Sequence, residues 1–332
     1  MNPTPALREL APEHALRRLE LTVTRRLDGL LQGDHLGLLP GPGSEPAEGR
    51  EYVPGDDVRT MDWNLTARST VPHVRDRVAD RELETWALVD ATASMDFGTG
   101  RLEKRDLAVF AVAAVAFLTE RAGNRIGAQI VRDDGPLHVP ARTGRPHLLG
   151  LLRTLLAVPR GAPGRGGDGS ASASLGAAAG LLRRTGAARR GLVVAVSDFL
   201  DPVASWQRPL RLLAARHQLL AVEVVDPREL TLPDVGMLTV VDPETGRRRE
   251  IPTASGRLRE RYAAAAARQR AEIAAGLRAA GAAHLRLRTD GDWVRDLVRH
   301  VLTQRRTAAA AAPPPAAGPA SGAPPAPGGG AA

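Results

Sequence analysis

Two stretches decide the fold: TWALVDATAS at residues 85–94 and LVVAVSD at residues 192–198. Each contains a short apolar run that leads to an aspartate, Asp90 in the first and Asp198 in the second. Continuous apolar runs of this length are typical of parallel strands that are buried on both faces. Because ligands of α/β folds bind beyond the carboxyl ends of such strands, we expect Asp90 and Asp198 to lie close together at one edge of the sheet.

The segments around these two runs alternate between strand and helix patterns. Further strands are expected at residues 125–131, 137–139, 219–225 and 284–288, and helices at residues 101–121, 146–156, 175–185, 204–217, 256–280 and 293–305. This alternation predicts an α/β fold with a doubly wound, mostly parallel sheet that carries helices on both faces.

The chain divides into four parts by composition and pattern. Leucines at helical spacing predict an N-terminal helix within residues 1–34, and a polar loop followed by an edge strand is expected over residues 35–82. The α/β domain then spans residues 83–306, with a β-hairpin near residues 236–252. Residues 307–332 contain only Ala, Pro, Gly, Ser and Thr, and we expect this tail to be disordered because it cannot build a core.

The composition excludes several classes of protein. The chain has no cysteine, so disulfides, thiolate catalysis, zinc–thiolate sites and iron–sulfur clusters are ruled out. The formal net charge is +8, but the arginines are scattered among acidic residues, so biased composition explains the charge better than nucleic-acid binding does. No apolar run is long enough for a membrane helix and no signal-peptide pattern is present. A cytoplasmic location is therefore expected.

The residues after the first apolar run carry oxygen ligands at alternate positions. In an extended loop Asp90, Thr92 and Ser94 point the same way, and Asp198 follows the second run. A carboxylate and two hydroxyls suit Mg²⁺ or Mn²⁺, with Asp198 completing the site directly or through water. The alternative is that these side chains only cap the turn and helix that follow.

The Asp-x-Thr-x-Ser spacing resembles the metal-ion-dependent adhesion site of von Willebrand factor A domains, which usually reads Asp-x-Ser-x-Ser. The later Ser197-Asp198 resembles the downstream aspartate of that family. The family also uses a threonine in an intervening loop, for which this chain has no clear equivalent. Ser172 and Ser174 are the nearest candidates for that position.

A closer resemblance lies before the domain. The stretches SE at residues 44–45, GREYVPGDDVRTMDW at residues 49–63 and AR at residues 67–68 resemble the signature of a bacterial family catalogued as domain of unknown function fifty-eight. The resemblance continues through GRPHL at residues 144–148 and VSDFLDP at residues 196–202. It implies a von Willebrand A-like domain that works with a MoxR-type AAA+ ATPase in the chaperone-like maturation of client proteins. The ATPase would be a partner, because this chain has no Walker A motif.

Charged residues dominate this signature. They are Arg50, Glu51, Asp56, Asp57, Arg59, Asp62 and Arg68. We expect them to form an ion-pair network that anchors the loop against the sheet, with Tyr52 and Trp63 as its buried apolar contacts. Direct contact with a partner is the alternative.

The sequence favours a protein-interaction module over an enzyme. It has neither a Gly-x-Ser-x-Gly elbow nor a His-Glu-x-x-His motif, and the Asp-Phe-Gly triplet at residues 96–98 lacks the other kinase motifs. We expect a partner's carboxylate to complete the metal coordination. The alternatives are a metal-dependent phosphoester hydrolase and an arginine-rich nucleic-acid binder.

Overall fold

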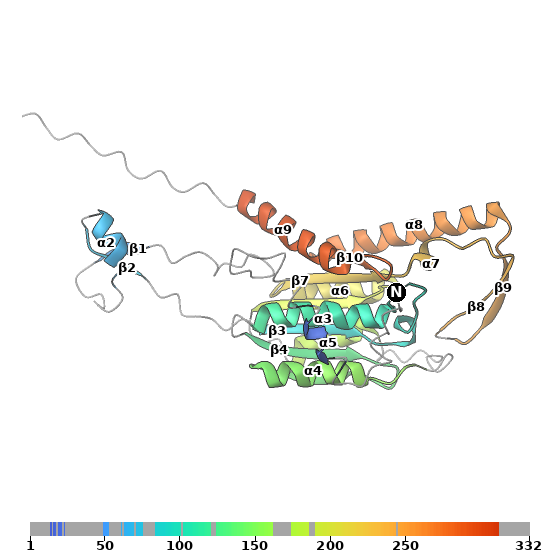
Figure 1. The fold of residues 1–332 in the computed structure, drawn as a ribbon, viewed down its shortest axis with the longest axis horizontal. Coiled ribbons are helices and arrows are strands. Elements are labelled where there is room, and N and C mark those ends of the chain that lie inside the picture. Colours follow the sequence, from blue (N-terminus) through green and yellow to red (C-terminus); the bar gives the residue numbers. More distant parts are fainter. Residues whose placement is uncertain are drawn as a thin grey trace, which may run out of the picture.

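A six-stranded sheet forms the centre of the computed structural model (Figure 1). The structure describes residues 14, 16, 17, 19–21, 23, 49–52, 61, 63–69, 71–75, 84–100, 102–120, 124–161, 174–185, 190–243 and 245–311. The strands of the sheet are β3 (Glu84–Asp90), β4 (Arg125–Val131), β5 (Leu137–Arg142), β6 (Gly191–Ser197), β7 (Gln218–Val225) and β10 (Ala283–Arg288). Their order is β10-β7-β6-β3-β4-β5, and only β5 runs antiparallel to its neighbour.

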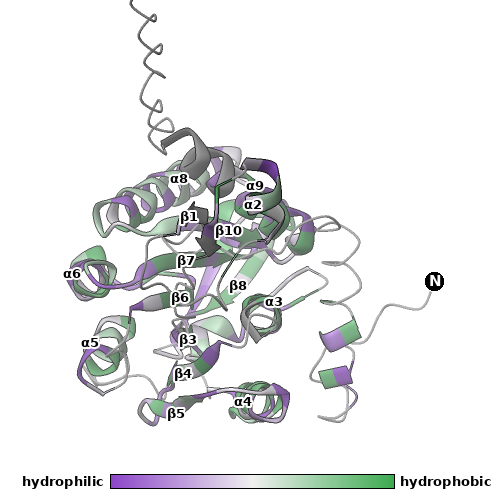
Figure 2. Cartoon of the chain, turned by 90° about the vertical axis from the view of Figure 1, so that its left-hand side faces the viewer, coloured by the Kyte–Doolittle hydropathy of each residue, from purple (hydrophilic) through white to green (hydrophobic). Residues whose placement is uncertain are grey.

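Helices cover both faces of this sheet (Figure 2). One face carries α3 (Lys104–Glu120), α4 (Arg145–Ala157) and α9 (Trp293–Ala311), and the other carries α5 (Leu175–Thr185), α6 (Val203–Ala214) and α8 (Gly256–Ala279). Successive residues of β3 point to opposite faces, so Ala87 and Val89 join the first core whereas Trp86 and Leu88 join the second. The expected doubly wound α/β fold is confirmed, and the arrangement is consistent with a von Willebrand factor A-like domain.

The N-terminal segment packs on the domain where the structure describes it. Residues 14, 16, 17, 19–21 and 23 are helical. Leu16, Leu19 and Val23 are buried in the core that contains α3 and α4, and Glu20 forms an ion pair with Arg145 of α4. This part of the helix therefore covers the domain itself.

The signature region forms small elements that lie apart from the central sheet in Figure 1. Strand β1 (Gly49–Glu51) pairs with β2 (His73–Arg75) in a separate antiparallel sheet, and α2 (Trp63–Ser69) lies between them in the chain. The part of the expected edge strand that the structure describes, β2, is thus a strand whose described partner is β1. The prediction of a buried Trp63 is wrong: its side chain is 69% exposed at the start of α2.

The remaining signature residues are only partly described. Tyr52 is half-buried and its N–H donates to the carbonyl of Pro72 (2.8 Å), while Arg68 is exposed. Arg50 and Glu51 lie in β1. Asp56, Asp57, Arg59 and Asp62 lie outside the described residues, so the expected ion-pair network stays a prediction.

The remaining elements to compare with the sequence expectations are the hairpin and the C-terminal helix α9. The hairpin of β8 (Met237–Val241) and β9 (Arg248–Pro252) is present and projects from the end of the domain at which the parallel strands terminate (Figure 1). Helix α9 continues to Ala311, so the tail expected from residue 307 begins with helix, because alanine is the strongest helix former. Residues 312–332 lie outside the described part.

None of the helices described combines the length and apolar character needed to cross a membrane.

Candidate metal centre

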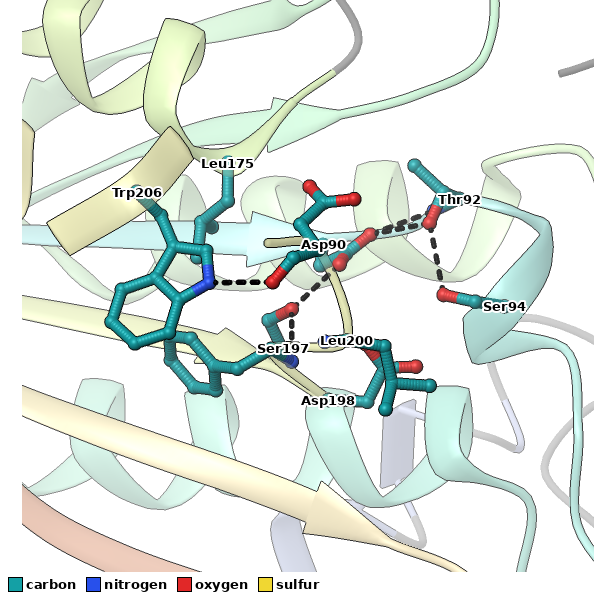
Figure 3. Close-up of a pocket in the computed structure, with 10 residues that line it drawn as sticks. Asp90, Thr92, Ser94, Leu175, Ser197, Asp198, Leu200 and Trp206 are labelled. Carbon is teal, nitrogen blue, oxygen red and sulfur yellow. Dashed lines mark hydrogen bonds between the residues drawn. The ribbon is translucent and has the colours of Figure 1, made fainter. Parts of the chain in front are cut away.

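The predicted oxygen ligands meet at the carboxyl edge of β3 and β6, which are parallel neighbours in the sheet. Asp90, Thr92, Ser94 and Asp198 line a cavity of about 30 Å³, which is room for one water molecule or one ion (Figure 3). Leu175 and Trp206 supply apolar walls on one side. The convergence that the two apolar runs predicted is therefore observed.

Asp90 lies at the centre of the hydrogen bonds in this cavity. Its Oδ1 accepts from the hydroxyl of Thr92 (2.7 Å) and from the N–H of Thr92 (3.0 Å), and its Oδ2 accepts from the hydroxyl of Ser197 (2.7 Å). The hydroxyls of Thr92 and Ser94 are 3.3 Å apart. Thr92 precedes the short 3-10 helix η3 (Ala93–Met95) but makes no side-chain capping bond to it. Its hydroxyl is therefore committed to Asp90 and not to helix capping.

The pKa values of the two aspartates shift in opposite directions. Burial and the neighbouring charge of Asp198 raise the pKa of Asp90 to about 6, against the hydrogen bonds from Ser197 and Thr92. Burial alone would also raise the pKa of Asp198, but the ammonium of Lys104 outweighs it and holds that pKa below its usual value. Asp198 thus has a directly bonded counter-charge, whereas the hydrogen bonds described for Asp90 come from neutral donors and Arg105 acts on it only at longer range.

Lys104 is a site residue that the sequence analysis missed. Its side chain is 1% exposed, and its Nζ lies 2.8 Å from Oδ2 of Asp198 and 2.6 Å from Oε1 of Glu229. Burial alone would lower the pKa of Lys104, but these two carboxylates outweigh it and hold the pKa above its usual value, so the side chain is a charged ammonium. The only available signal was that Lys104 is the single lysine of the chain.

A second buried cation holds the backbone behind the site. Nη1 of Arg270, on α8, donates to the carbonyl of Asp198 (3.0 Å) and to Glu223 of β7 (3.2 Å), while Nη2 donates to Glu229 (3.3 Å). Glu229 lies in the short helix α7 (Pro227–Leu230), so it joins Lys104 to Arg270. The charges thus form one connected network from β6 to α8.

The loop after Asp198 is fixed by aromatic packing and by an unusual backbone. Phe199 has a φ of 56°, which is uncommon for a residue with a side chain, and its N–H donates to the hydroxyl of Ser197 (3.0 Å). Its ring meets Trp206 edge to face at 5.4 Å, and the indole N–H of Trp206 donates to the carbonyl of Asp201 (3.1 Å). Asp201, another residue that the sequence analysis did not single out, also lines the cavity.

Of the two weaker ligand candidates, Ser174 is not among the described residues that line the cavity. Ser174 precedes α5, and its hydroxyl accepts from the N–H of Ala177 (3.1 Å), which caps that helix. Ser172 lies outside the described residues. Within the described part of the chain, no three His, Asp or Glu side chains are grouped so as to hold a metal by themselves. A cation at this site would therefore depend on hydroxyl and water oxygens as well as on Asp90.

Comparison with known proteins identifies the family. A model described as "Protein of unknown function DUF58" matches residues 48–272. The chain belongs to this family. An uncharacterized protein of Mycobacterium tuberculosis is 54% identical over 292 residues, which cover 88% of this chain and 89% of the relative. An uncharacterized protein of Mycobacterium avium is 48% identical over 168 residues, covering 51% of this chain and 94% of that protein.

Solved structures also match this DUF58 chain. One of them is the crystal structure of the conserved hypothetical protein BatB from Bacteroides thetaiotaomicron. The match has 12% identity and a TM-score of 0.39, and it covers 68% of this chain and 99% of that chain.

Proposed function

We propose that this DUF58 protein is a non-enzymatic interaction module whose site takes Mg²⁺ or Mn²⁺ and, through it, a carboxylate of a partner protein. The observation that carries the proposal is the convergence of Asp90, Thr92, Ser94 and Asp198 on one ion-sized cavity at the carboxyl edge of the sheet. Carboxylate and hydroxyl oxygens are the ligands that these hard cations prefer.

The surroundings of the cavity support binding by a rigid site. Asp90 is oriented by bonds from Ser197 and Thr92, so its position depends on the two central strands and not on a free loop. Asp198 is oriented by Lys104 through its side chain and by Arg270 through its carbonyl. In the part of the chain that the structure describes, no three His, Asp or Glu side chains gather here, so an ion would keep open coordination positions that water or a partner's carboxylate could fill.

We further propose that the partner is a MoxR-type AAA+ ATPase acting on client proteins in the cytoplasm. Support for this comes from membership of the DUF58 family and from the lack of a Walker A motif in this chain, which leaves ATP hydrolysis to another protein. The β8–β9 hairpin projects from the same end of the domain as the cavity and would add contact area beside it.

Calorimetric titration of Mg²⁺ and Mn²⁺ tests the metal site. Asp90→Asn keeps the size of the side chain but removes its charge, and we expect it to weaken binding at least about tenfold. Asp134→Asn, at an exposed carboxylate that pairs with Arg132, is the matched control and should bind as the unmodified protein does. Equal binding by both variants would show that the cavity does not hold the ion.

A second arm tests the carboxylate. A short acidic peptide should bind the protein in Mg²⁺, lose binding in EDTA, and fail to bind Asp90→Asn in either condition. Binding that persists in EDTA would contradict capture through the ion.

A further inference from the structure

Lys104 is a buried lysine beside the candidate metal cavity, where a positive charge would oppose the binding of a cation. Lysine is almost never fully buried unless it is paired, and Lys104 is paired with two carboxylates at once. One of them, Asp198, lines the candidate metal cavity, whereas the other, Glu229, lies behind it on α7. The ammonium therefore lies between the cavity and the charge network that leads to α8.

The oxygens of Asp198 are already engaged without an ion. Its Oδ1 accepts from the N–H of Leu200 (3.2 Å) and its Oδ2 accepts from Lys104 (2.8 Å). A divalent cation that approached Oδ2 would meet a positive charge on the same oxygen, at a depth where solvent screens little. Asp90, in contrast, accepts hydrogen bonds only from neutral donors among the bonds described: the hydroxyls of Thr92 and Ser197 and one backbone N–H.

We infer that Lys104 is the resident counter-cation of Asp198 and that it keeps the affinity of the site for a free divalent cation low. The inference rests on the proposed function and names the residue that regulates that site. With Asp198 neutralised, the ion depends on Asp90 and two hydroxyls, so firm capture needs the negative charge that a partner's carboxylate adds. Ion and partner would then bind together and not in succession.

Glu229 gives the ammonium a second place to bond. If an ion bound Asp198, Lys104 would keep its bond to Oε1 of Glu229, which is the shorter of the two ion pairs that Lys104 makes (2.6 Å). Arg270 holds the other oxygen of Glu229 (3.3 Å), which fixes the carboxylate in place for this role. Removing Lys104 and removing the charge of Glu229 should therefore change metal affinity in opposite directions.

Two variants test this opposition by titration with Mn²⁺ alone. Lys104→Met keeps the apolar stem and removes the ammonium, and it should bind Mn²⁺ about tenfold or more tightly than the unmodified protein. Glu229→Gln removes the second acceptor and should bind Mn²⁺ several-fold more weakly. A merely structural ion pair would weaken binding in both variants, because both would disorder Asp198.

The unmodified protein offers a test that does not depend on the folding of a variant. Since Lys104 is the only lysine, protein labelled with ¹³C-lysine gives a single side-chain ε-methylene signal. Saturation with Mg²⁺ should shift this signal, and the same titration of Asp90→Asn should leave it in place. Saturation of the site by calorimetry without any change in the Lys104 signal would overturn the inference.

The outcomes separate the two proposals. Equal Mn²⁺ affinity in Lys104→Met and the unmodified protein would overturn the role of Lys104 and leave the metal site standing. Absence of Mn²⁺ binding in both proteins would overturn the metal site and the inference with it. Binding that appears only in Lys104→Met would support both.

Discussion

Replacing Arg270 by methionine should destabilise the α/β domain by about 3 kcal/mol. Arg270 is 5% exposed and bonds Glu223, Glu229 and the carbonyl of Asp198. Removing one partner of a buried ion pair costs about 3–5 kcal/mol, because the other charge is left buried without compensation. The lower end applies here, since Glu223 keeps two further partners in the side chains of β10 and Glu229 keeps the ammonium of α3. For a domain of this size, the melting temperature should fall by about 6–12 °C.

The assay is urea denaturation and thermal melting of Arg270→Met beside Arg286→Met. Arg286 bonds the same carboxylate of Glu223 (2.7 Å), but its own side chain is 41% exposed, so solvent screens it and its loss should cost less than the loss of Arg270. The comparison therefore keeps Glu223 as a shared acceptor and varies the burial of the donor. A change below about 1 kcal/mol in Arg270→Met, or equal changes in both variants, would refute the argument that burial makes this network costly to break.

Three further predictions concern stability. Burial alone would raise the pKa of Asp226, but hydrogen bonds from the side chain and backbone of Thr99 and from other donors outweigh it and hold that pKa below its usual value. The ionised carboxylate therefore stabilises the fold above its unfolded pKa of about 4, and this contribution is lost as the pH falls through the lower folded pKa. In Asp226→Asn the urea midpoint of unfolding should therefore fall less steeply as the pH is lowered. An unchanged slope of the urea midpoint against pH would contradict this. A Cβ at Gly191 would lie 1.9 Å from the carbonyl oxygen of Glu84, so Gly191→Ala should cost about 3 kcal/mol or more in the same assay. At Gly150, inside α4, a Cβ meets nothing within 4 Å, so Gly150→Ala should stabilise by about 0.5–1 kcal/mol, and a loss there would be evidence against this packing.

The fold was predictable where hydrophobic pattern alone determines the element. Strand β4 and helix α5 have the same bounds that their patterns predicted, because each combines an apolar run with a clear end signal. The meeting of Asp90 and Asp198 followed from their common place after buried strands, since parallel strands end at one edge. These features depend on local sequence and on the general geometry of α/β sheets.

The features that escaped prediction depend on contacts between distant parts of the chain. Nothing local marks Lys104 as buried, because its partners lie 94 and 125 positions away, and a lysine at the start of a helix is normally solvated. Trp63 was expected to be buried from its size and apolar character, yet its short helix lies apart from the central sheet and leaves the ring exposed. The bond from Ser197 to Asp90 likewise required the register of β3 and β6.

The burial of the single lysine has a chemical consequence. Reagents that acylate amines attack exposed lysines on most proteins, but the only lysine side chain of this chain is enclosed between Asp198 and Glu229. Its ammonium becomes reactive when α3 moves away from Asp198 and Glu229, and such a movement disturbs the core on one face of the sheet because α3 packs there. The rate at which Lys104 is acylated therefore reports on the opening of this domain, because no other side-chain amine contributes to the signal.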